Sequence, residues 1–144
     1  MDDIDRKILK LLQANARTSL KTIAENTFLS SPAVSARIEK MEKDGIISGY
    51  HAQIDPMKLG YHIIAFINLN VIPDDKPKFY SYAESIPNVL ECNCVTGEYS
   101  MLIKVAFEST MQLDAFIGEL QKFGGTSTQI VFSTHVGPRG VYVE

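Results

Sequence analysis

The stretch that decides the fold runs from Thr18 to Tyr50 and reads TSLKTIAENTFLSSPAVSARIEKMEKDGIISGY. It predicts two short amphipathic helices joined by a tight connector, with Ser19 as the N-cap of the first helix. Because a proline disfavours the helical region for the residue before it, we expect Ser31 to be the N-cap of the second helix and Pro32 its first residue. This is the layout of a helix-turn-helix, whose second helix lies in the major groove of DNA.

The predicted second helix has two different faces. Val34, Ile38 and Met41 recur at helical spacing and define a buried face. The opposite face is small and basic, which suits close approach to a groove lined by phosphates, and it carries Pro32, Ala33, Ala36, Lys40 and Lys43, flanked by Ser35 and Arg37. A plain helical hairpin with a solvated face fits the same pattern, so the neighbouring segments decide between the two interpretations.

Those neighbours favour a winged helix. Asp44-Gly45 is expected to end the second helix, and Ile46–Ile54 then contains two β-leaning runs broken by Ser48-Gly49. Before the motif, an apolar stripe predicts a helix from about residue 3 to residue 14, with Ile4, Ile8, Leu11 and Leu12 at its core positions. The sequence therefore predicts a three-helix core followed by a small hairpin.

The second half of the chain has a different texture. Residues 55–60 lack periodicity and read as a linker, and the segments after them predict strands within 62–71, 88–96, 99–107 and 128–136. One helix is expected around 79–86, and another is expected to open with Ser109 and Gln112 as a capping box. The order βαββαβ is that of a ferredoxin-like α+β domain, which leaves one face of its sheet bare. We expect a second subunit to cover that face.

Five motifs in a fixed order carry a resemblance along the whole chain: DIDRKIL at 3–9, LSS at 29–31, VSARI at 34–38, GIISGY at 45–50 and VTGEY at 95–99. With them the chain resembles the leucine-responsive and asparagine-synthesis regulators, the Lrp/AsnC or feast/famine family. The resemblance implies a transcriptional regulator, not an enzyme, whose winged helix binds double-stranded DNA. It also implies a ferredoxin-like domain that dimerises and assembles into octamers. The expected domains are 1–54 for the winged helix and 61–144 for oligomerisation and effector binding.

We expect two binding sites, one for DNA and one for an effector. The DNA-binding set joins the predicted recognition helix to the start of the helix before it: Ser19, Lys21, Ser31, Pro32, Ser35, Ala36, Arg37 and Lys40. The resemblance implies a pocket between dimers that binds small amino-acid effectors, and the matching residues here are Gly97, Glu98, Tyr99, Ser100, Thr134 and Val136. Ser100 stands where the family usually has an aspartate, and a hydroxyl binds an ammonium group more weakly than a carboxylate does, which leaves Glu98 as the substitute charge.

The residues at the start of the recognition helix also predict how DNA is chosen. Direct readout relies on Arg or Lys bidentate to guanine and on Asn or Gln bidentate to adenine. None of Ser31, Pro32, Ala33, Ser35 and Ala36 can make such a contact. We therefore expect the protein to respond to DNA shape, by bending or wrapping, more than to base sequence.

Length, charge and composition exclude further classes of protein. The 144 residues carry a net charge of −3, and residues 1–50 are the less acidic part, with eight Lys or Arg against seven Asp or Glu. Such a weak basic footprint predicts several copies acting together. No signal peptide, membrane span, catalytic constellation, metal-ligand spacing or cofactor loop is evident, so we expect a cytoplasmic protein without cofactors. Cys92 and Cys94 are expected to be buried apolar residues. Two alternative interpretations stay open: an architectural protein that wraps DNA without an effector, and an enzyme or metabolite-binding module whose helical half has another role.

Overall fold

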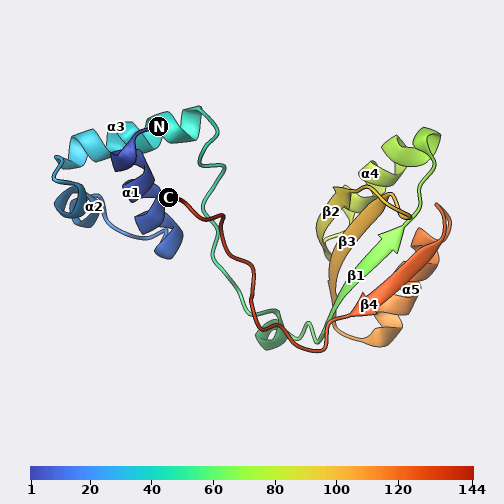
Figure 1. Cartoon of the computed structure of the whole chain (residues 1–144). Helices are drawn as coiled ribbons and strands as arrows, with labels where there is room; N and C mark the ends of the chain where they lie inside the picture. Colours follow the sequence, from blue (N-terminus) through green and yellow to red (C-terminus); the bar gives the residue numbers. More distant parts are fainter. The chain divides into compact units, whose positions relative to one another are not determined.

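The computed structural model describes all 144 residues, and its contacts divide the chain into two compact units (Figure 1). The first unit comprises Met1–Gln53 together with Gly137–Glu144, and the second comprises Ile54–Val136. The last eight residues therefore differ from the sequence assignment, which put all of 61–144 in one domain. Within the first unit, the Gln13 side chain donates a hydrogen bond of 3.1 Å to the Val141 carbonyl of this tail. None of the α-helices combines the length and the apolar character needed to cross a membrane.

The first unit is a bundle of three helices. They are α1 (Asp3–Ala14), α2 (Leu20–Thr27) and α3 (Ser31–Lys43). Their apolar stripes meet in one core, whose buried members are Ile8, Ile23, Ala24, Val34 and Met41. The helical spacing in the sequence thus predicts the core correctly, because each stripe must be buried against the other two.

Side chains cap each of these helices. Asp2 and Asp5 form a reciprocal capping box at the start of α1, in which each carboxylate accepts the other residue's N–H at 2.9 Å. Ser19 caps α2 as predicted. The prediction of Ser31 as the cap of α3 is wrong by one residue, because Ser30 is the cap and accepts from the Ala33 N–H at 3.3 Å. Starting one residue earlier adds the backbone bond from the Val34 N–H to the Ser30 carbonyl.

The wing expected after α3 is not formed as a hairpin. Gly45 ends the helix in the left-handed region with φ +72°, as its place after Asp44 predicts, but Ile46–Ile54 contains no strand. The N–H groups of Ile46 and Ile47 both donate to the Met41 carbonyl instead. A two-stranded ribbon is marginally stable without a third partner, and only Ile47 in these β-leaning runs is even half-buried.

The second unit has the predicted ferredoxin-like order. A 3-10 turn η1 (Pro56–Leu59) leads into β1 (Ile63–Leu69), and a second 3-10 turn η2 (Pro73–Asp75) precedes α4 (Lys76–Ser85). The chain continues through β2 (Val89–Cys94), β3 (Met101–Phe107), α5 (Thr110–Leu120) and β4 (Thr126–Ile130). All pairs are antiparallel, and the strand order is β2-β3-β1-β4.

Both helices of this unit cover the same face of the sheet (Figure 1). Phe79 and Ala83 of α4 and Leu113, Phe116 and Leu120 of α5 share one core with the alternate residues of β1 and β3. The residues between them point to the other face. That open face mixes apolar and polar side chains, and it carries Ile64, Phe66, Asn68, Glu91, Asn93, Leu102, Lys104, Ala106, Ser127 and Gln129. The Lys104 ammonium lies 5.8 Å from the centre of the Phe66 ring.

The last strand is shorter than predicted. β4 ends at Ile130, and the segment up to residue 136, which the sequence assigned to the strand, has no regular structure. Its only sheet neighbour is β1, and the bond from the Val131 N–H to the Ile64 carbonyl lies at the start of that strand. Without a further backbone partner the chain leaves the sheet, and the Phe132 side chain is fully exposed.

The turn from α5 into β4 lies close to the end of β1. A Cβ added at Gly124 would meet the Asn70 carbonyl oxygen at 1.7 Å, whereas one added at Gly125 would meet nothing within 4 Å. The Asn70 N–H donates to the Gly125 carbonyl at 3.0 Å. A side chain is therefore excluded at the first of the two glycines and accommodated at the second.

Cys92 and Cys94 are exposed and free, so the expectation that they are buried is wrong. They pair with Ile103 and Met101 and so point to the same face as the core, but β2 is an edge strand. At this edge α4 covers them only in part, and the Lys76 ammonium lies 3.8 Å from the Cys94 sulfur. Burial raises the pKa of the Cys92 thiol.

Candidate nucleic-acid interface and effector site

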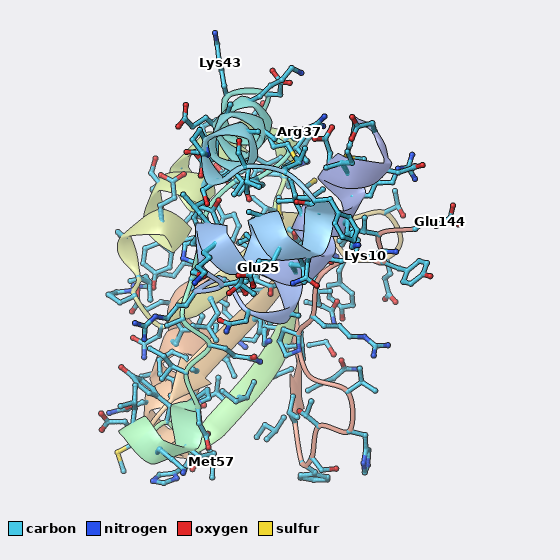
Figure 2. All side chains as sticks on the ribbon, turned by 90° about the vertical axis from the view of Figure 1, so that its left-hand side faces the viewer. Lys10, Glu25, Arg37, Lys43, Met57 and Glu144 are labelled. Carbon is cyan, nitrogen blue, oxygen red and sulfur yellow. The ribbon has the colours of Figure 1, made fainter.

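The outward face of α3 carries the small and basic side chains that the sequence predicts. Pro32, Ala36, Lys40 and Lys43 are exposed, and Ser31, Ala33 and Ser35 are half-buried. The residues opposite them, Val34 and Met41, lie in the three-helix core. Figure 2 shows Lys43 extending away from the end of α3. Helix packing therefore fixes which face of α3 is free.

Two polar groups on this face are held by partners within the same helix. The Lys40 ammonium donates to the Asp44 carboxylate at 2.9 Å, and this hydrogen bond raises the pKa of Lys40. The Ser35 hydroxyl donates to the Glu39 carboxylate at 3.0 Å. Exposed pairs four residues apart on a helix are weak, so a phosphate can replace Asp44 as the partner of Lys40 at little cost.

The start of α2 offers a second group of predicted contacts. The Ser19 hydroxyl accepts from the Thr22 N–H at 3.1 Å and lies 2.9 Å from the Thr22 hydroxyl, so its first role is that of a cap. Lys21 is exposed and takes part in no ion pair of the chain. The first backbone N–H groups of a helix and a free ammonium beside them suit a phosphate.

Arg37, which the sequence predicts to make phosphate or groove contacts with DNA, forms ion pairs within its own unit. Its Nη1 atom donates to Asp2 and to Asp5, at 2.8 Å in each case. The bonds to Asp2 and Asp5 raise the pKa of Arg37. The Asp5 N–H and then the guanidinium lower the pKa of Asp2. Burial acts to raise the pKa of Asp5, but the Asp2 N–H and the guanidinium outweigh it and lower that pKa.

A signal in the sequence could have found this arrangement. At about 100° per residue, Arg37 lies only about 60° from Val34 around the helix. It therefore borders the face packed against α1, and the acidic start of α1 supplies the carboxylates. The outward face lies on the other side of the helix.

The turn between α2 and α3 contains a residue that no pattern in the sequence singles out. Phe28 adopts the left-handed conformation, with φ +56° and ψ +32°, and its ring is 93% exposed. The Lys7 ammonium lies 5.8 Å from the centre of the ring. A left-handed residue after a helix is usually glycine, so an exposed phenylalanine here is a strained exception.

The predicted effector residues fall into two groups. Gly97, with φ +111°, the exposed Glu98 and the half-buried Tyr99 form the turn between β2 and β3. Ser100 closes that turn, and its hydroxyl is held inside the domain because it accepts from the Val71 N–H at 2.9 Å and lies 3.3 Å from the Leu69 carbonyl. The hydroxyl therefore fastens β3 to the end of β1.

Thr134 and Val136 lie elsewhere. They follow the end of β4, which pairs with β1 through Ala65, whereas Ser100 bonds the opposite end of β1. A single chain does not bring the two groups together. Two cavities, of about 620 and 290 Å³, are lined by other residues, the first between α1 and the tail and the second between α4 and β2. No group of three or more metal-ligating side chains is present.

Comparisons with known proteins cover both units. The family of winged helix-turn-helix DNA-binding domains matches residues 1–48, and the Lrp/AsnC ligand-binding domain matches residues 64–141. The HTH-type transcriptional regulator FL11 of Pyrococcus horikoshii is 34% identical over 138 residues, which are 94% of this chain and 91% of that protein.

Solved structures agree. AsnC of E. coli superposes with a TM-score of 0.86 at 31% identity and covers 96% of each chain. A feast or famine regulatory protein from M. tuberculosis, complexed with L-methionine, superposes with a TM-score of 0.90 at 29% identity and covers 99% of each chain. These relatives are transcriptional regulators and not enzymes. The chain belongs to the Lrp/AsnC family of helix-turn-helix transcriptional regulators.

Proposed function

We propose that this regulator binds DNA as a homo-oligomer, through the outward face of α3 and the start of α2, and that a small amino-acid-like molecule modulates it. Its DNA-contacting residues are Ser19, Lys21, Ser31, Pro32, Ser35, Ala36 and Lys40. The observation that carries the proposal is the outward face of α3, which is free, small and basic while the opposite face is packed in the core. The protein acts in the cytoplasm, where the DNA lies.

Within this proposal, DNA shape matters more than base sequence. The exposed or half-buried side chains at the start of α3 are hydroxyls, methyls and a proline ring, which can make single hydrogen bonds and thymine-methyl contacts only. One such module binds weakly and discriminates poorly. Several modules on one oligomer gain affinity by acting together, and wrapping favours DNA that is already curved.

The effector belongs to the second unit. The M. tuberculosis relative is complexed with L-methionine, which supports an amino-acid-like ligand for this chain as well. Gly97, Glu98, Tyr99 and Ser100 lie at one end of the sheet, and Thr134 with Val136 lies past the other end. A pocket that uses both groups needs two chains, so effector binding and assembly are coupled in this proposal, with octamers as the assembled form.

The test is a gel-shift competition between curved and straight DNA fragments of matched composition, repeated with and without L-methionine and other amino acids. We expect preferential binding of the curved fragment and a change in affinity or complex size when the correct amino acid is added. Equal affinity for both fragments, with single base substitutions costing tenfold or more, would show direct base readout. Curvature preference without any amino-acid response would favour the architectural alternative.

A further inference from the structure

Arg37 joins the recognition helix to the first helix of the same unit. Its Nη1 atom lies 2.8 Å from both Asp2 Oδ2 and Asp5 Oδ1. The two carboxylates are themselves fixed, because each accepts the other residue's backbone N–H in the capping box of α1. The guanidinium therefore binds a preformed pair of carboxylates, and Figure 2 labels Arg37 on α3.

The charges at this point disfavour a phosphate. One guanidinium faces two carboxylates, so the three side chains together carry a net charge of −1 at neutral pH. The lowered pKa values of Asp2 and Asp5 keep both carboxylates ionised. Both carboxylates bind Nη1, so a phosphate would have to approach the remaining guanidinium N–H groups beside two carboxylates whose charge exceeds that of the cation.

The geometry also gives Arg37 a mechanical role. α3 is held to α1 at two places: the apolar core, where Val34 and Met41 meet Ile8, and the ion pairs of Arg37 at the amino terminus of α1. An apolar contact alone tolerates some rotation of a helix, whereas a second fixed point restricts it. The Asp5 side chain is only 16% exposed, so its carboxylate has little freedom to follow Arg37 if α3 rotates.

We infer that Arg37 is a positioning residue: through Asp2 and Asp5 it sets the orientation of the recognition helix, and it does not itself bind a DNA phosphate. This inference rests on the proposed DNA-binding face. The two can be tested separately, because removing a phosphate contact changes the salt dependence of the DNA affinity, whereas removing a positioning contact does not. Each phosphate contact contributes about 0.9 to the slope of log affinity against log salt concentration.

The experiment measures the affinity of the full-length protein for one curved DNA fragment at several salt concentrations, by fluorescence anisotropy. The variants are Arg37→Ala, Arg37→Lys, Asp2→Asn with Asp5→Asn, and the three changes combined. Lys21→Ala serves as the matched loss of one positive charge. Thermal unfolding of each variant sets the temperature at which all are folded, and Arg37→Gln, which also removes the positive charge, supplies a slope if Arg37→Ala unfolds.

We expect Arg37→Ala to weaken binding on the order of tenfold with an unchanged salt slope, and Arg37→Lys to restore most of the affinity. The double asparagine variant should weaken binding to a similar extent, and adding Arg37→Ala to it should have no further effect. A slope lowered by about 0.9 in Arg37→Ala, or tighter binding in the double asparagine variant, would overturn the inference. So would unchanged affinity in both variants. Lys21→Ala tests the proposed face separately, because only that variant should lower the slope.

Discussion

At the scale of single residues, the clearest case of local strain is Phe28. Its left-handed backbone costs roughly 1–3 kcal/mol for a residue with a side chain, and its 93% exposed ring gains almost nothing from burial. Asparagine tolerates this conformation better than other non-glycine residues. We expect Phe28→Asn to raise the free energy of unfolding by about 0.5–1 kcal/mol in urea titrations.

Phe28→Ala is the control, because alanine removes the ring but keeps the strained backbone. It should leave stability unchanged or slightly lower, since the contact with Lys7 is also lost. If Asn and Ala behave alike, backbone strain at this residue is not the cause.

The Ser100 hydroxyl has a structural role within the second unit. Its oxygen is the partner of the Val71 N–H, and Val71 is only 5% exposed. Ser100→Ala leaves that N–H without a partner and should lower the free energy of unfolding by about 1–2 kcal/mol in urea titrations. The control is Ser85→Ala, whose exposed hydroxyl bonds a carbonyl within α4 and should matter little. Equal effects of the two changes would contradict this role for Ser100.

At the scale of secondary-structure elements, the turn between α5 and β4 offers a matched pair of glycines. An alanine at Gly124 would overlap the Asn70 carbonyl, and β1 cannot withdraw because it is paired on both sides. We expect Gly124→Ala to destabilise the protein by about 2–3 kcal/mol or more, measured by thermal unfolding. Gly125→Ala meets open space and should change the melting temperature little, and a reversed order of the two would be inconsistent with this packing.

The amino terminus of α1 makes this element sensitive to acid. The pKa values of Asp2 and Asp5 are lowered in the folded state, so the stability they contribute is present above the unfolded value of about 3.8 and is lost as the pH falls through the folded values. Thermal unfolding of the full-length protein between pH 7 and pH 3 should show this loss below about pH 4. The double variant Asp2→Asn with Asp5→Asn should depend less on pH in that range, and an identical profile would exclude these two carboxylates.

Whether the sequence predicts a structural feature correctly depends on the interaction that determines that feature. Apolar periodicity predicts Val34 and Met41 in the core, because burial acts on every member of a stripe. Where two neighbouring residues can both act as a cap, the prediction is wrong by one residue, because Ser30 caps α3 and not Ser31. The predictions of the wing hairpin, of the end of the last strand and of buried cysteines were wrong. Each of these features depends on whether another strand or helix packs beside it, which the local sequence does not show. The ion pairs of Arg37 were not predicted because the two carboxylates are more than thirty residues away in the sequence.

At the scale of the whole molecule, the open face of the sheet is the surface through which we expect copies to associate. Leu102 lies on this face between Asn68 of β1 and Asn93 of β2 and diagonally from Phe66, and Gln129 lies on the outer strand β4. Leu102→Glu introduces a charge that a second sheet would have to desolvate. Sedimentation velocity at micromolar concentration should show a smaller species for this variant, with unchanged circular dichroism.

Gln129→Glu is the control for that experiment, since it adds the same charge at an exposed edge position. It should retain the wild-type sedimentation coefficient. Association that survives Leu102→Glu would exclude the open face as the contact between copies.

The two exposed thiols give the protein built-in labelling sites. Cys92 and Cys94 are its only cysteines, and both lie on the edge strand of the second unit, so a maleimide dye attaches there and leaves the helix-turn-helix unmodified. The raised pKa of Cys92 lowers the fraction of its thiolate, which is the form that reacts with a maleimide. A fluorophore on this strand, paired with one on the DNA, would follow assembly and wrapping by energy transfer in the native sequence.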